Sequence, residues 1–196
     1  MLLSVGGTAT NWKSLLATTV TISNFATTLK ALVSNYNLDG IDLKIENSFP
    51  APDNVTQAIV QLRTRLNELG SAKLITVTAQ CGAIYQGVAV PSSSLADQYY
   101  NFLVHIVKEA DSSIDYYQVQ AYNDWYEFAG GSLQYLQNVY LNWRNLQGMS
   151  QWGSTPIAGF SGVSPSKLVM GVLGSSGGGG SYYYSLTTLG AFKNWL

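Results

Sequence analysis

Residues 38–46 constrain the fold of this chain more than any other segment. They read LDGIDLKIE, and apolar and polar residues alternate along them with the period of a β-strand. Successive side chains on a strand point to opposite sides, so one face of this segment is apolar and the other is ionisable. The ionisable face consists of Asp42, Lys44 and Glu46.

Three ionisable groups on one strand face are costly to bury without partners, so we expect this face to line a cleft. An edge strand with a solvated outer face is the alternative, because antiparallel sheets often expose one face to water. Two observations favour the cleft. Helical patterns flank the segment, which indicates a parallel sheet, and residues 73–78 repeat the strand pattern after the next helix.

Strand-like and helix-like segments alternate along the whole chain. The expected strands are residues 1–5, 38–46, 73–78, 114–122 and 167–173. Apolar residues at helical spacing predict helices at residues 22–36, 55–69, 95–110, 133–146 and 186–196. This order predicts a single α/β domain over residues 1–196, with a parallel sheet and right-handed crossovers.

Two motifs resemble those of a known family. Residues 39–46, DGIDLKIE, resemble the DxxDxDxE signature of glycoside hydrolase family 18, the chitinases and chitinase-like lectins. Asp39, Asp42 and Glu46 match the signature, whereas Lys44 stands in place of its third aspartate. Residues 4–7, SVGG, resemble the SxGG motif on the preceding strand of that family. The resemblance implies a TIM (β/α)8 barrel.

Five strand–helix units are too few for a closed barrel of this kind, which has eight. Against the family pattern, the chain begins at the third strand and ends after the helix that follows the seventh. We therefore expect an incomplete barrel with two open sheet edges, which invite pairing with another chain. Self-association, completion within a longer protein and a stable rearranged partial barrel all remain open.

The resemblance also assigns catalytic roles. In this family the N-acetyl group of the substrate is the nucleophile of a retaining hydrolysis. Glu46 would be the general acid, and Lys44 occupies the place of the aspartate that orients the acetamido group. A lysine only donates hydrogen bonds, opposes a developing cation and favours the ionised form of Glu46. We expect hydrolysis to be lost or severely impaired, and Asp42 to pair with Lys44.

A second wall of the site is expected at residues 118–123, QVQAYN, at the end of a strand. They resemble the family segment in which a tyrosine hydroxyl contacts the acetamido carbonyl, so Tyr122 would take that role beside Gln120 and Asn123. Gln118, Gln120 and Tyr122 share one strand face, which supports a polar lining. A strand with a half-solvated face is the alternative.

Three further residues complete the expected substrate-binding set. Gly7 belongs to the SxGG-like motif, and Gln80 follows its strand as a wall residue. Several aromatic residues, Trp12 among them, fall in expected loops, and aromatic faces stack well on sugar rings. Trp125, directly after the Tyr122 segment, is the best candidate for a sugar platform.

Composition limits the classes of partner. Only 11% of the residues are charged and the formal net charge is −1, which argues against nucleic acid and anionic membranes. Neutral sugars suit this polar, weakly charged surface. One histidine and one cysteine predict neither a metal site nor a disulfide framework, and we expect no cofactor. The low charge and the sequon at residues 54–56 favour an extracellular location, although residues 1–4 are no signal peptide.

Three functions follow as hypotheses. The first is a chitinase-like protein that binds chitin or chito-oligosaccharides without hydrolysing them efficiently. The second is an active retaining endochitinase that cleaves β-1,4-N-acetylglucosamine linkages by substrate-assisted catalysis. The third is a scaffold that binds no sugar and acts through protein partners at its sheet edges.

Overall fold

The computed structural model describes all residues except 71, 91, 93–98, 124–130, 148–154 and 176–181. Its strands form one parallel sheet in chain order: β1 (Leu2–Gly6), β2 (Gly40–Lys44), β3 (Leu74–Gln80), β4 (Tyr116–Gln120) and β5 (Leu168–Gly171). The helices are α1 (Trp12–Leu15), α2 (Thr19–Asn35), α3 (Pro52–Asn67), α4 (Phe102–Ala110), α5 (Leu133–Trp143) and α6 (Leu186–Trp195). The predicted α/β class and all five parallel strands are confirmed.

Two elements differ from the expectation. The short helix α1 was not predicted, because four residues are too few to show a helical period. Helix α4 begins at Phe102 instead of residue 95. Asn101 has a left-handed backbone (φ 58°) that cannot continue an α-helix, and its buried side chain accepts from Tyr85 N–H and donates to Val88 O. This asparagine ties down the preceding loop and fixes the start of the helix.

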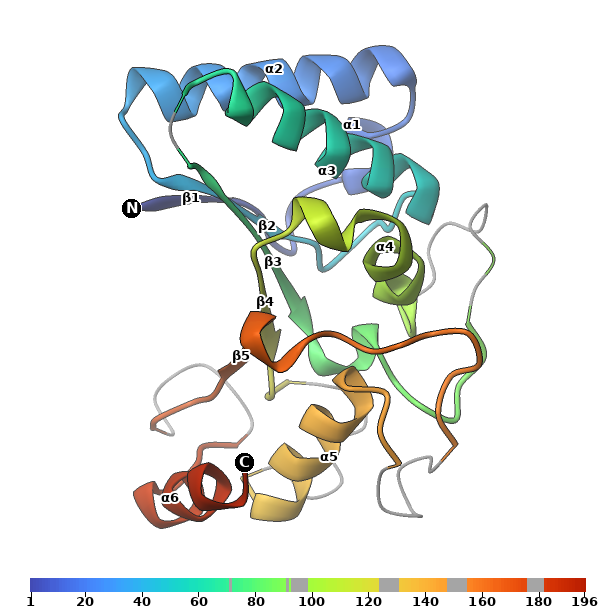
Figure 1. The fold of residues 1–196 in the computed structure, drawn as a ribbon, viewed down its shortest axis with the longest axis vertical. Coiled ribbons are helices and arrows are strands. Elements are labelled where there is room, and N and C mark those ends of the chain that lie inside the picture. The colour runs from blue at the N-terminus through green and yellow to red at the C-terminus, as the bar shows by residue number, and fades with distance from the viewer. Residues whose placement is uncertain (71, 91, 93–98, 124–130, 148–154, 176–181) are drawn as a thin grey trace.

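The two faces of the sheet differ in the way the alternation predicts. The face toward α2, α3 and α4 is dry, and its central side chains are at most 1% exposed: Ile41, Leu43, Ile75, Val77, Tyr117 and Val119. α2 packs against α3, and α3 packs against α4 (Figure 1). Each aliphatic side chain buried in this way contributes about 1.5–3 kcal/mol. The opposite face carries Asp42, Thr76 and Gln118, so polar groups are confined to one side of the sheet.

Tyr117 is the one hydroxyl-bearing side chain in this dry layer. Its hydroxyl donates to Asp111 Oδ1 at 3.0 Å. Burial, followed by the Asp111 charge and this hydrogen bond, raises the pKa of the Tyr117 phenol well above its ordinary value. Tyr117 therefore stays neutral, as a residue of the core must.

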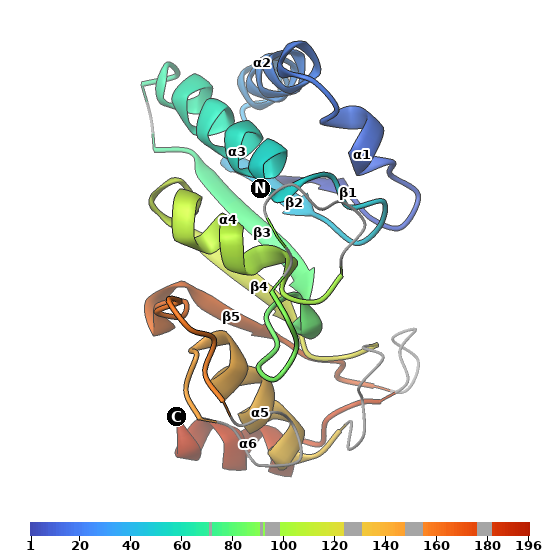
Figure 2. The same ribbon diagram turned by 90° about the vertical axis from the view of Figure 1, so that its right-hand side faces the viewer.

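The sheet is open at both edges in the described part of the chain. β1 pairs with β2, β5 pairs with β4, and the other side of each edge strand has no partner there. The N-terminus lies at the β1 edge, whereas α5 and α6 pack together at the opposite end of the molecule (Figures 1 and 2). The predicted self-association through these edges stays a prediction.

Substitution of Trp143 tests how much one buried side chain contributes to the stability of the fold. It is fully buried, lies edge-on to Tyr117 and donates its indole N–H to Cys81 O at 2.9 Å. We expect Trp143→Ala to lower the free energy of unfolding by about 3–5 kcal/mol, through the cavity and the orphaned carbonyl. Urea denaturation measures the change.

Val20→Ala is the control, because Val20 is exposed on α2. It should change the free energy of unfolding by no more than about 0.5 kcal/mol. Equal effects of the two substitutions would contradict the core described above.

Candidate functional site

A polar cleft of about 520 Å³ lies at the carboxyl ends of the first four strands. This is the end of a parallel sheet at which barrel enzymes build their sites. Its lining residues are Gly6, Gly7, Thr8, Ala9, Lys44, Glu46, Gln80, Gln120, Tyr122 and Asn123. The structure thus brings together most of the predicted site residues. Trp125 lies outside the described residues, and Asp42 lies deeper, one strand position below the lining.

Lys44 and Glu46 form an ion pair in this cleft. Lys44 Nζ lies 3.1 Å from Glu46 Oε1, so the expected pairing of these two residues is present. The Glu46 side chain is 8% exposed, whereas the Lys44 side chain is 34% exposed. The carboxylate is therefore the covered member of the pair, and the ammonium is the member that faces the cleft.

Asp42 does not pair with Lys44 in the described structure, so that expectation was wrong. Its carboxylate, in a residue only 7% exposed, accepts four hydrogen bonds of 2.7–3.3 Å from neutral donors: Ser4 Oγ, Thr76 Oγ1, Thr78 Oγ1 and Gln118 Nε2. The sheet register explains why Asp42 binds these donors and not Lys44, because Ser4 and Thr76 lie directly beside Asp42 on the flanking strands. These donors satisfy the buried carboxylate, and the lysine is left to Glu46.

The glycine pair at the end of β1 brings that strand against Lys44. Gly7 N–H donates to Lys44 O at 2.9 Å, and the Trp12 indole N–H donates to the same oxygen at 3.2 Å. Gly6 has φ 126°, and a Cβ there would lie 2.1 Å from Lys44 O. Only glycine permits this approach.

Trp12 was expected in a loop, yet it is fully buried at the start of α1 and packs edge-on against Phe25. It supports the cleft from below as a positioning residue. No pattern in the sequence points to this role, since a tryptophan after a glycine-rich turn is equally compatible with a sugar platform.

The opposite wall is built at the end of β4. Gln120 Nε2 donates to the Tyr122 hydroxyl at 2.8 Å, and Asn123 holds a left-handed backbone with φ 58°. Gln80 Nε2 reaches Asn123 O at 3.5 Å, which links the ends of β3 and β4. Beneath them, the buried Tyr184 donates its hydroxyl to Ala121 O at 2.7 Å. Tyr184 is a support that sequence reasoning missed, because its partner is a backbone atom.

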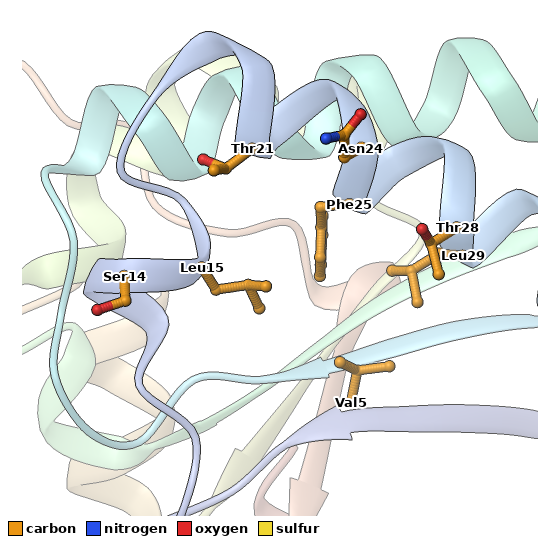
Figure 3. A pocket seen from close by; sticks show the side chains of 8 residues that line it. All are labelled: Val5, Ser14, Leu15, Thr21, Asn24, Phe25, Thr28 and Leu29. Carbon is orange, nitrogen blue, oxygen red and sulfur yellow. The ribbon is translucent and has the colours of Figure 1, made fainter.

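A second, apolar hollow of about 390 Å³ lies between β1 and α2 (Figure 3). Val5 points into it from the strand, and Phe25 and Leu29 point into it from the helix. Its lining includes no ionisable side chain, so it offers no acid, base or charge for catalysis. It is on the helix-covered face of the sheet, because Val5 pairs in register with Leu43.

Two further chemically capable side chains, those of His105 and Cys81, have partners elsewhere in the structure. His105 Nε2 lies 2.6 Å from Asp53 Oδ1, and Cys81 is buried. Among the described residues, no group of three histidine, cysteine, aspartate or glutamate side chains is placed to hold a metal ion. In the same part of the chain, no helix has the length and apolar character needed to cross a membrane.

The family follows from a comparison of the sequence with family models. The model of glycosyl hydrolases family 18 matches residues 1–177, which contain the whole cleft. The chain belongs to glycosyl hydrolase family 18. A search of curated proteins finds no match to it.

Solved structures of this family share the fold. A family 18 chitinase from Pseudoalteromonas aurantia is 20% identical with a TM-score of 0.71, and the match covers 98% of this chain and 65% of that one. The C-terminal domain of ChiA from Legionella pneumophila is 23% identical with a TM-score of 0.67, covering 96% and 63%. A class V chitinase from Nicotiana tobaccum is 17% identical with a TM-score of 0.56, covering 87% and 47%. The chain thus spans less than two thirds of the length of these structures.

Substitution of Gly6 tests whether the close approach of β1 to the Lys44 carbonyl is required. We expect Gly6→Ala to lower the free energy of unfolding by at least about 2 kcal/mol, because the new methyl group meets the Lys44 carbonyl and strains the backbone. Thermal or urea unfolding measures the loss.

Gly174→Ala is the matched control, since a Cβ at Gly174 meets nothing within 4 Å. It should be neutral to within about 0.5 kcal/mol. A Gly6→Ala protein as stable as this control would show that the close approach of β1 to Lys44 is not required.

Proposed function

We propose that this family 18 chain is a chitinase-like protein that binds chitin or chito-oligosaccharides with hydrolysis lost or severely impaired. The observation that carries the proposal is the Lys44–Glu46 ion pair inside a cleft whose other described lining residues are uncharged. Each consequence of that pair follows from the family mechanism.

The first consequence concerns the acid. Glu46 would have to give a proton to the glycosidic oxygen. In the structure its carboxylate lies 3.1 Å from the Lys44 ammonium, and the Glu46 side chain is only 8% exposed. Glu46 would have to leave this ion pair before it could serve as the acid.

The second consequence concerns the substrate. The reaction develops positive charge as the acetamido group attacks the sugar carbon. Lys44 places a second positive charge in the cleft and offers no acceptor for the acetamido N–H. Both effects oppose the transition state more than the bound ground state, so they reduce turnover while leaving binding in place.

Binding depends on the parts of the cleft that are neutral. Tyr122 and Gln120 form a hydrogen-bonded wall, Asn123 is adjacent, and Gln80 joins the ends of two strands. Amides and hydroxyls of this kind match the hydroxyls and acetamido groups of a neutral sugar. Tyr122 would contact the acetamido carbonyl, and Trp125 would supply an aromatic platform.

An extracellular location is part of the proposal. Its support is the low charge of the chain together with the family assignment. The sequon adds nothing, because Asn54 Nδ2, the atom that would carry a glycan, donates to Leu16 O at 2.8 Å in the first turn of α3.

An active endochitinase that cleaves β-1,4-N-acetylglucosamine linkages is the second candidate. The observation in its favour is that Glu46 and Tyr122 both line the cleft, while Asp42 lies on β2, two residues before Lys44. A scaffold that binds protein partners has only the open sheet edges in its favour.

Calorimetric titration with chitohexaose, with product analysis on the same sample, separates these functions. We expect binding heat with little product, and Lys44→Asp should raise the hydrolysis rate at least about 100-fold by restoring the acceptor and the negative charge. Glu46→Gln added to Lys44→Asp should remove the gain.

Fast hydrolysis by the unaltered chain would support the active endochitinase instead. Neither heat nor product would favour the scaffold, and a Lys44→Asp protein that binds but stays inactive would contradict the role given to Lys44.

A further inference from the structure

The charges that a ligand meets in the cleft are unequal. Of the lining residues, Lys44 carries the positive charge and Glu46 the negative charge. Because the Glu46 side chain is 8% exposed and that of Lys44 is 34% exposed, an incoming group contacts the ammonium first. The surface of the pair that faces the cleft is therefore cationic.

Asp42, which precedes Lys44 by two residues on β2, is not among the described residues that line the cleft. Asp42 is 7% exposed, and both of its oxygens accept hydrogen bonds from hydroxyl and amide donors. These donors stabilise its negative charge in place, three of them at Oδ1 and one at Oδ2. Asp42 lies below the lining and is not available to the ligand.

Lys44 also retains capacity to donate. An ammonium has three N–H donors, and in the described structure its charged partner is Glu46, on one side. Lys44 lines a cleft whose other described lining residues, apart from Glu46, are uncharged and include Gln120, Tyr122 and Thr8. A ligand carboxylate bound on the side of Lys44 away from Glu46 completes its coordination with a charge-assisted hydrogen bond.

We propose that the cleft prefers β-1,4-linked N-acetylglucosamine glycans that carry carboxylate groups over neutral chitin, and that Lys44 is the residue that determines this specificity. The inference rests on the proposed sugar-binding function and deepens it. A carboxylate at this position would accept a hydrogen bond from an N–H of the sugar, whereas a lysine there donates hydrogen bonds to an anion.

The test compares two tetrasaccharides with the same β-1,4 backbone. One is chitotetraose, and the other carries a lactyl ether in place of one hydroxyl on alternate N-acetylglucosamine units, which adds carboxylates to the same backbone. By titration calorimetry at low ionic strength, the full chain should bind the acidic tetrasaccharide at least about tenfold more tightly. The preference should shrink in high salt, because the contact is partly exposed.

Two variants and one modified ligand assign the preference to the charge of Lys44. Lys44→Met should bind both tetrasaccharides equally, whereas Lys44→Arg should retain the preference, with unfolding midpoints measured to show that both are folded. The methyl ester of the lactyl groups, which has no charge, should bind the unaltered chain no better than chitotetraose does. This ligand arm keeps the test decisive if Lys44→Met fails to fold.

The possible outcomes separate a failure of the carboxylate preference from a failure of the proposed sugar binding. Equal affinity of the unaltered chain for both tetrasaccharides, or a preference that persists in Lys44→Met, would overturn the inference and leave chitin binding standing. Absence of binding to either glycan would overturn the proposed function as well.

Discussion

The backbone carbonyl of Lys44 is the point at which the cleft is assembled. It accepts the N–H of Gly7 and the indole N–H of Trp12, and it lies where a Cβ of Gly6 would otherwise be. These contacts hold the end of β1 and the start of α1 against the end of β2. The Lys44 side chain is aimed into the cleft from a backbone that cannot easily shift, so its charge acts at a defined place.

The carboxylates of Asp42 and Glu46, on either side of Lys44 in the sequence, have different kinds of partner. Asp42 is surrounded by neutral donors from both neighbouring strands and is satisfied as a buried anion. Glu46 lies beyond the end of β2, and its partner in the described part of the chain is the ammonium of Lys44. The residue that we propose in the place of the family's acid is here half of an ion pair, which is why we infer binding without efficient hydrolysis.

Much of this site could be predicted because its residues lie on short, regular segments. The alternation of residues 38–46 places Asp42, Lys44 and Glu46 on one side, and parallel strands bring Gln80, Gln120 and Tyr122 to the same edge. The partners that come from elsewhere could not be predicted. Which groups satisfy Asp42 depends on the register of β1, β2 and β3, and a single sequence does not display register.

The residues that position the walls of the site could not be predicted for a related reason. Trp12 and Tyr184 act by donating to backbone carbonyls, and any residue supplies such an acceptor, so no pattern of residue types marks the pair. The start of α4 was missed because a buried Asn101 side chain, and not helix propensity, decides where that helix begins. Side chains that bind backbone atoms far away in the sequence leave no periodic signal.

A crystal structure of the chain soaked with chitotetraose tests the central claim most directly. The account predicts an intact tetrasaccharide in the cleft, in contact with Tyr122, with the Lys44–Glu46 pair still formed beside the glycosidic bond. Cleaved sugar in the cleft, or a Glu46 carboxyl turned from Lys44 onto the glycosidic oxygen, would contradict it.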